Sequence, residues 1–173
     1  MDIELILKDK TIKAKDNVEK LSNAVLTGEI KIADVIKAGS ATKGSEKGTC
    51  VEALEFITRS NPEMSSQKCL EFAVGCLTDK APRVRWEAAK VIGNIACLYK
   101  TKLDDAIVRL LANTEYPGTV VRWSSAYAIS SIVLLNTKHN TDLIPAVEAI
   151  IQREENNAIR KIYSACLKKV QKN

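Results

Sequence analysis

One stretch of the chain is spelled twice. Residues 83–96 read RVRWEAAKVIGNIA and residues 120–133 read VVRWSSAYAISSIV, so a valine, an arginine and a tryptophan return together after 37 residues. A weaker third copy, AIRKIYSACLKKV, occupies residues 158–170. A constant period of this length is typical of helix-turn-helix units that bury their apolar faces only by stacking on their neighbours. The repeat therefore predicts an α-solenoid.

The composition agrees with an all-α chain. Aromatic residues make up 5% of the 173 residues, and there are only 7 Gly and 4 Pro, as expected for helices rather than a β-sandwich. The length fits one domain that needs no metal or disulfide to fold. Because Cys50, Cys69, Cys76, Cys97 and Cys166 lack CxxC spacing and His139 is the sole histidine, we expect free thiols, a reducing compartment and no metal site.

The ends of the chain bear on its location and charge. No apolar run reaches the roughly 18 residues that a bilayer requires, and the opening MDIELILKDK has no secretory cleavage site. We therefore expect a cytoplasmic protein with no membrane contact. The net charge of +5 lies within residues 158–173, which hold five basic residues and no acid. This basic end either complements the carbonyls of a terminal helix or contacts phosphates.

Turn residues divide the chain into helices. We expect one helix at 12–27 that Gly28 ends, a short one at 32–36, a flexible loop at 39–48 (GSATKGSEKG), and helices at 51–58, 103–113 and 143–153. Asn61-Pro62 should open a helix whose buried face carries Cys69, Leu70, Ala73, Cys76 and Leu77. For residues 1–28 only helix is predicted.

Residues 76–96, CLTDKAPRVRWEAAKVIGNIA, resemble the HEAT repeat. A leucine, Asp79, a proline, Val84-Arg85, Ala88-Ala89 and Ile92-Gly93 stand at that family's spacing. The second copy departs from it, with Asn113 to Glu115 where Asp is expected and Ser130 in place of the glycine, and the third keeps only Ile159-Arg160, Ser164 and Leu167. The resemblance covers about residues 62–173. It implies a right-handed α-α superhelix, which we expect to hold four to five antiparallel helix pairs in one domain, with degenerate helices at 1–61 and repeats at 62–101, 102–139 and 140–173.

The resemblance also implies a role for the repeated arginine. In HEAT repeats, Asp in the turn and Arg at the start of the second helix form a ladder of side chains that bridges adjacent units. Here the ladder would contain Asp79, Arg85, Arg122 and Arg160, with Glu154 or Glu155 as the acid for the last of these. Bidentate pairing of Arg with a carboxylate suits this structural role, and binding of a ligand by the arginines is the alternative.

The repeated tryptophan lies on a second face of its helix. With Val84 at zero and roughly 100° per residue, the apolar core positions cluster on one side, whereas Trp86 and Lys90 point the other way. Later copies place Trp123, Tyr127, Lys161 and Lys168 on that face. Since the resemblance implies that second helices line a concave surface, these six residues would form a partner-binding stripe. The alternative is that Trp86 and Trp123 pack sideways against neighbouring helices.

The chain contains no catalytic motif and no cofactor-binding motif, so we predict a scaffold that is not an enzyme, needs no cofactor and binds a protein or peptide. The first alternative is a nucleic-acid-binding protein, because DNA alkylation repair glycosylases are built from HEAT-like repeats and use Trp, Arg and a catalytic Asp in the concavity. The Trp stripe, however, shows no acidic residue for that role. Phycobilin lyases, whose repeats look similar, are a further alternative, although no lyase signature is visible. The oligomeric state stays open.

Overall fold

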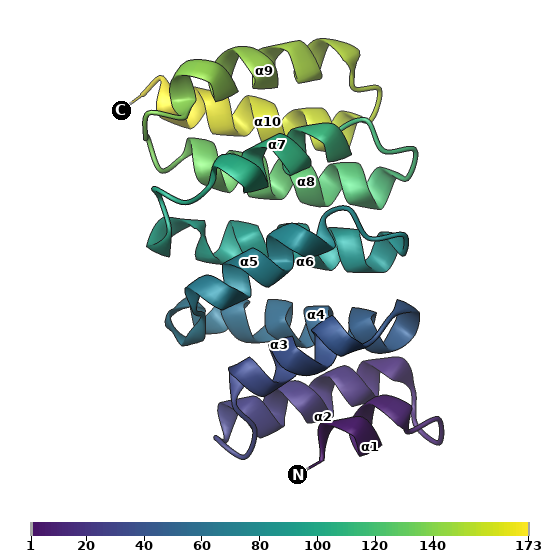
Figure 1. The fold of residues 1–173 in the computed structure, drawn as a ribbon. Helices are drawn as coiled ribbons and strands as arrows, with labels where there is room; N and C mark the ends of the chain where they lie inside the picture. The colour runs from purple at the N-terminus through teal and green to yellow at the C-terminus, as the bar shows by residue number, and fades with distance from the viewer. Residues whose placement is uncertain (1, 173) are drawn as a thin grey trace.

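The computed structural model describes residues 2–172, and every regular element in that range is helical. Ten α-helices form five antiparallel pairs stacked one upon another (Figure 1). The first helices of the pairs are α1 (Ile3–Lys8), α3 (Ile32–Ala41), α5 (Gln67–Cys76), α7 (Asp104–Asn113) and α9 (Asn140–Arg153). The second helices are α2 (Ala14–Leu26), α4 (Gly44–Ser60), α6 (Pro82–Ile95), α8 (Thr119–Val133) and α10 (Asn157–Val170). The predicted all-α solenoid of four to five pairs is confirmed.

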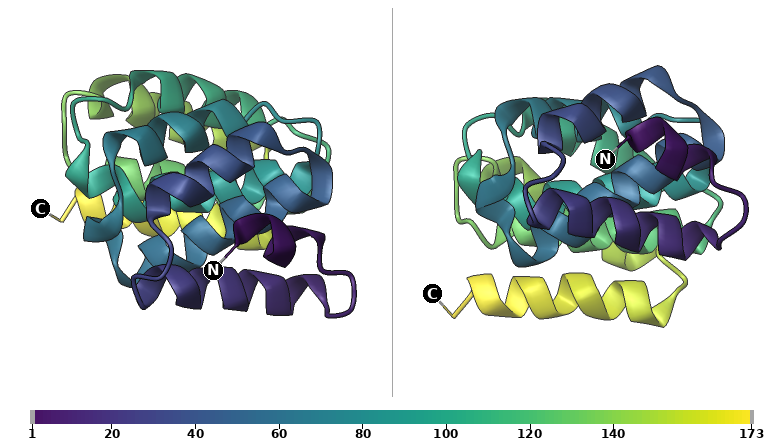
Figure 2. Two further views of the ribbon diagram at one scale, coloured as in Figure 1. Left: turned by 60° about the horizontal axis from the view of Figure 1, so that its bottom comes forward. Right: turned by 90° about the horizontal axis from the view of Figure 1, so that it is seen from below.

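The two helices of each pair belong to different layers. Seen from the α1 end, α1 and α3 lie on one side of the stack, and α2 and α10 on the other (Figure 2). The second helices pack closely on one another, whereas contacts between successive first helices are sparse. The core lies between the layers, where Ile92 and Ile129 are fully buried at equivalent positions of α6 and α8. We call the solvent-facing side of the second helices the second-helix face.

Local signals explain where several helices begin and end. Gly28 follows α2 with a φ of +80°, a conformation that costs glycine little. The side chain of Asn156 accepts hydrogen bonds from the first amides of α10. Asn61-Pro62 was expected to open α5, but Pro62–Met64 forms a 3-10 turn and the helix starts later, with Ser66 as its cap. The buried face expected for α5 is confirmed, since Cys69, Leu70, Ala73, Cys76 and Leu77 are all buried.

The flexible loop expected at residues 39–48 is wrong. Residues 39–41 belong to α3 and residues 44–48 to α4, which leaves only two residues between the helices. Glycines suggested the loop, but two of them serve helix packing. A Cβ on Gly39 would lie 2.7 Å from the Phe72 ring, and one on Gly48 would lie 3.3 Å from Arg83 Cδ. Close approach of neighbouring helices therefore explains these glycines better than backbone flexibility does.

Candidate partner-binding face

The six residues predicted as a stripe all lie on α6, α8 and α10. Trp123 is 40% exposed. Lys161 and Lys168 are exposed, while Trp86, Lys90 and Tyr127 are partly buried (stripe: Trp86, Lys90, Trp123, Tyr127, Lys161 and Lys168). On each helix the stripe lies opposite the buried residues, so it belongs to the second-helix face. The sequence argument thus placed these side chains on the side of the helices that the structure leaves open.

The α6 part of the stripe is tied up by two carboxylates. Trp86 Nε1 donates to Glu87 Oε1 at 2.6 Å, and Lys90 Nζ lies 2.7 Å from Glu87 and 3.6 Å from Glu55. Both glutamates are only 5% exposed. Burial raises the pKa of Glu87, and the contacts with Lys90 and Trp86 oppose that rise. Lys90 therefore already has two acidic partners within the protein.

The prediction that the Trp stripe carries no acid is therefore wrong. Glu87 stands roughly 100° from Trp86 on the helix wheel, but its side chain reaches the indole N–H. Glu55 comes from α4, one repeat earlier, in the part of the chain that the sequence assigned only to degenerate helices. Helical angle alone does not include the length and direction of a side chain, which decide whether it reaches a neighbouring position.

The α8 part of the stripe is an ordered aromatic pair. The rings of Trp123 and Tyr127 are stacked, with centroids 6.3 Å apart and planes 5° from parallel. The Tyr127 hydroxyl is hydrogen-bonded to the Asn94 side chain at 2.7 Å, and burial raises the pKa of this phenol. Gly93 makes room for the ring, because a Cβ there would lie 2.5 Å from Tyr127 Cε1. The Tyr127 ring is consequently held in place, with Trp123 stacked on it.

The α10 part of the stripe is basic and open. Within residues 2–172, neither Lys161 nor Lys168 takes part in an ion pair. Arg160, beside them, donates to Asn157 on its own helix. In the same range, no three His, Cys, Asp or Glu side chains gather as a metal site. The second-helix face therefore runs from a self-paired polar region on α4 and α6, through aromatics on α8, to free positive charge on α10.

The arginine ladder has different partners from those expected. Arg122 meets Glu154 through two hydrogen bonds of 3.0 and 3.3 Å, so Glu154 serves the preceding repeat and not Arg160. Arg85 donates to the carbonyl of Asp79 and to Asn113 Oδ1, while the Asp79 carboxylate pairs with Lys47 at 2.8 Å. Lys47 of α4 and Arg122 of α8 thus reach the turn of the next repeat, and Arg85 of α6 reaches the last residue of α7 just before that turn.

These contacts lower the pKa of both acids of the ladder, Glu154 and Asp79. Burial would raise the pKa of Glu154, but hydrogen bonds from Arg122 and from the Asn156 amide hold it below its ordinary value. The pKa of Asp79 is lowered in the same way: burial would raise it, but the hydrogen bonds from Lys47 and from the Ala81 amide lower it further than burial raises it. Both carboxylates therefore stay charged and bind neighbouring repeats together.

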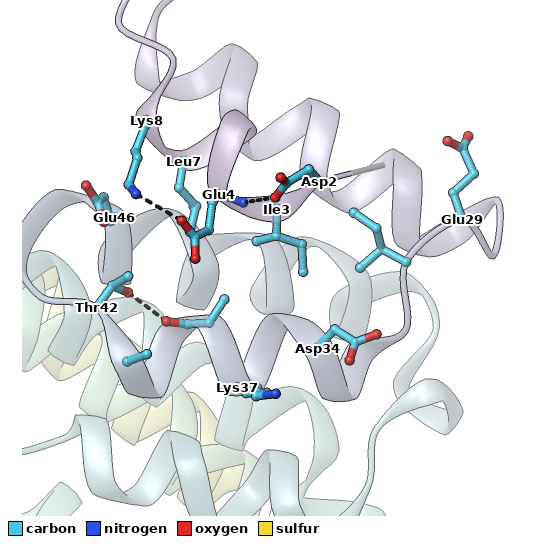
Figure 3. Close-up of a pocket in the computed structure, with 13 residues that line it drawn as sticks. Asp2, Ile3, Glu4, Leu7, Lys8, Glu29, Asp34, Lys37, Thr42 and Glu46 are labelled. Atoms are coloured by element: carbon cyan, nitrogen blue, oxygen red, sulfur yellow. Dashed lines mark hydrogen bonds and ion pairs between the residues drawn. The ribbon is translucent and has the colours of Figure 1, made fainter.

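A separate pocket of about 650 Å³ lies at the N-terminal end of the stack, away from the predicted stripe. Ile3 and Leu7 point from α1 toward α3 across this space, and Glu4 pairs with Lys8 at its edge (Figure 3). The remaining charged lining residues are Asp2, Glu29, Asp34, Lys37 and Glu46. Sequence reasoning predicted only helix here, because a space between two helices leaves no periodic signal.

Comparison with known proteins relates the chain to others through its fold. No family model matches the chain, and no curated protein matches it. Among solved structures, the complex of CpcE and CpcF of phycocyanin lyase from Nostoc sp. PCC7120 aligns with a TM-score of 0.72 and 16% identity, covering 95% of this chain and 97% of that one. A designed armadillo repeat protein in complex with the peptide (KR)4 aligns with a TM-score of 0.70 and 19% identity, covering 96% and 72%.

Both similar structures lie below the sequence identity at which activity can be compared, and they agree on architecture. No helix within residues 2–172 has the length and apolar character needed to span a membrane. The HEAT-like resemblance seen in the sequence is confirmed at the level of fold: the chain is a HEAT- or armadillo-like α-solenoid.

Proposed function

We propose that this chain is a non-enzymatic scaffold that binds a protein or peptide partner on its second-helix face, through Trp86, Lys90, Trp123, Tyr127, Lys161 and Lys168. The observation that carries the proposal is the stacked pair of Trp123 and Tyr127, in which Trp123 remains 40% exposed and Tyr127 is hydrogen-bonded to Asn94. Large aromatic side chains at fixed positions are the commonest anchors of protein interfaces.

Pre-organisation favours binding at this pair. The hydrogen bond between Tyr127 and Asn94 holds the Tyr127 ring in place, and Trp123 stacks on that ring. Binding of a partner therefore costs less side-chain conformational entropy than binding to mobile side chains would. Lys161 and Lys168 extend the surface with free positive charge, which favours partners with acidic groups.

A protein partner suits this face better than a nucleic acid. The buried carboxylates of Glu55 and Glu87 pair with Lys90, so the unpaired positive charge of the stripe is confined to Lys161 and Lys168 on α10. A phosphate backbone, in contrast, needs several cations in succession. The two similar structures, one a complex of CpcE with CpcF and one a peptide complex, support protein binding by this fold. They also leave a role as a subunit of an enzyme as the second candidate.

Partner capture tests the proposal. Replacing Trp86 and Trp123 together by Ala should abolish the specific capture of a partner by the immobilised protein, because both aromatic anchors are lost. The matched control is Val108→Ala, which changes an apolar side chain 67% exposed on α7, outside the second-helix face. Circular dichroism and gel filtration must show that each variant stays helical and monodisperse.

Two outcomes would contradict the proposal. Full capture by the Trp86 and Trp123 double variant would remove the aromatic stripe from the binding site. Alternatively, a salt-dependent affinity for DNA that is lost on replacing Lys161 and Lys168 by Gln would favour a nucleic acid as the partner instead of a protein.

A further inference from the structure

The short helix α1 fills its place in the stack incompletely. It has six residues, whereas the other first helices have ten to fourteen. Ile6 is its one buried side chain, and Leu5 is 72% exposed. Space remains on two sides of it: the pocket of about 650 Å³ between α1 and α3 (Figure 3), and a second pocket of about 770 Å³ between the end of α1, α2 and α4. The groove that holds α1 is therefore larger than α1.

Apolar contacts hold α1 against the rest of the protein. Ile3, Ile6 and Leu7 pack against the core from one side of the helix, at the i, i+3 and i+4 spacing typical of a helix seated in a groove. Glu4 and Lys8 pair with each other, and within residues 2–172 no side-chain hydrogen bond or ion pair joins α1 to another helix. This helix can therefore leave the groove without breaking a polar contact.

The charge of the groove does not match α1. The lining of the first pocket outside α1 and its cap contains three acids, Glu29, Asp34 and Glu46, and one base, Lys37. With its cap, α1 adds two acids and one base, so like charges face the same pocket. Glu46 lines both pockets and takes part in no ion pair within the described part of the chain. A basic occupant complements this groove better than α1 does.

A buried amide near the end of α1 also lacks a partner. Asn17 of α2 is 6% exposed and lines the second pocket. Its Nδ2 donates to the Asp9 carbonyl, while its Oδ1 has no hydrogen-bond partner among the described residues. An unpaired buried acceptor costs free energy. A lysine on a helix that extends beyond the end of α1 supplies the missing donor.

We propose that α1 is a displaceable occupant of this groove, and that a basic amphipathic helix of a partner protein takes its place against α2, α3 and α4. The partner helix repeats the apolar spacing of Ile3, Ile6 and Leu7 and carries lysine or arginine beside it. Since α2 has 13 residues, a helix of similar length fills the space that six residues leave open. A second copy of α1 is a poorer occupant, because it brings the same acids. The site lies apart from the second-helix face and goes beyond the function proposed there.

A synthetic helix tests the charge of the groove. The probe is the peptide KIAKILKAILKKA, blocked at both ends, and its control has glutamate in place of every lysine. Calorimetry with the full chain should show binding at least about tenfold tighter for the probe than for the control. Replacing Asp34 by Asn and Glu46 by Gln together should weaken binding of the probe about tenfold. The matched control, Asp142→Asn with Glu148→Gln at exposed positions of α9, should leave binding unchanged.

Two adjacent substitutions separate displacement of α1 from binding beside it. Ile6→Ser removes the buried anchor of α1 and should tighten binding of the probe about tenfold, because the groove is open in a larger fraction of molecules. Leu5→Ser changes the exposed neighbour and should leave the affinity unchanged. In the wild type, amide hydrogen exchange at short labelling times should become faster in α1 and slower in α2, α3 and α4 when the probe binds. Circular dichroism checks that each variant stays helical.

Several results would overturn the proposal. These are equal affinity for the two peptides, unchanged probe binding by the Asp34 and Glu46 double variant, and unchanged binding by Ile6→Ser. Slower exchange of α1 on binding would place the peptide beside α1 and not in its place. A wild type that is dimeric in gel filtration, and that Ile6→Ser makes monomeric, would make α1 of a second copy the occupant.

This groove and the second-helix face can fail separately. The double replacement of Trp86 and Trp123 should leave probe binding unchanged, because those residues lie on α6 and α8. Loss of probe binding in that variant would place the peptide on the second-helix face and overturn the groove as its site.

Discussion

The arginine at the start of each repeated helix has a different partner in each copy, and the partner determines what the arginine contributes. Arg122 forms an ion pair with Glu154, whose side chain is 4% exposed, whereas Arg160 is exposed and donates a hydrogen bond to Asn157. Sequence reasoning found the positions of the arginines, because the period fixes them. It did not find their partners, because acids in the turns recur at irregular intervals.

Removing Arg122 should destabilise the protein strongly. Arg122→Ala leaves the buried carboxylate of Glu154 without its cation, which we expect to lower the free energy of unfolding by about 3 kcal/mol. Arg160→Ala is the matched control and should change it by less than about 0.5 kcal/mol, since that side chain is exposed. Urea unfolding followed by circular dichroism measures both. Equal losses in the two variants would contradict the assigned ladder.

The same pair should make stability depend on pH. Because the folded-state pKa of Glu154 is lowered, its contribution is fully present above the unfolded pKa of about 4.3 and is lost as the pH falls through the folded pKa. Glu87 acts in the opposite sense, since its pKa is raised and its contribution is lost as the pH rises. The difference between wild type and Arg122→Ala should therefore shrink below about pH 4 in urea unfolding. A constant difference across that range would exclude Glu154 as the group responsible.

At the scale of elements, the approach of α6 to α8 depends on one glycine. A Cβ on Gly93 would lie 2.5 Å from the Tyr127 ring and 3.2 Å from the Ala128 Cα, so Gly93→Ala forces the helices or the ring to move. We expect a loss of about 2 kcal/mol and a shifted Trp fluorescence, because Trp123 stacks on that ring. Gly75→Ala, on α5 with nothing within 4 Å, should instead stabilise by about 0.5 kcal/mol. Stabilisation by both substitutions would show that α6 and α8 are not closely packed.

The number, kind and order of the later helices followed from the sequence, because apolar residues at the helical period report burial directly. The glycines at residues 39–48 led to the wrong prediction of a loop, because Gly39 and Gly48 allow close packing of helices. The side of α6 that carries Trp86 was predictable from its helical angle. Its contact with Glu87 was not, since it depends on the rotamers of two adjacent side chains. The pairing of Lys90 with Glu55 was not either, since it depends on how far α4 and α6 are displaced along each other.

At the scale of the whole molecule, the stack explains how this chain can share its fold with proteins of very different sequence. Each repeat contacts only its neighbours, so the core needs apolar residues at a few positions and tolerates wide variation elsewhere. Alignment at 16% and 19% identity over almost the whole chain is consistent with this. The proposed function rests instead on the exposed side of the second helices, where α6, α8 and α10 carry Lys90, Tyr127 and Ala165 at one equivalent position.

Nearest-neighbour stacking also predicts how stability varies along the chain. The helices α4, α6 and α8 each pack between two other second helices, whereas α1 has six residues, few contacts and a Leu5 that is 72% exposed. Amide hydrogen exchange measured by mass spectrometry should therefore be slowest in α4, α6 and α8 and fastest in α1. A partner bound to the proposed stripe should add protection on α6, α8 and α10 without changing α1, because the stripe lies on those three helices. Equal protection of all ten helices would instead show that the stack opens only as a single cooperative unit.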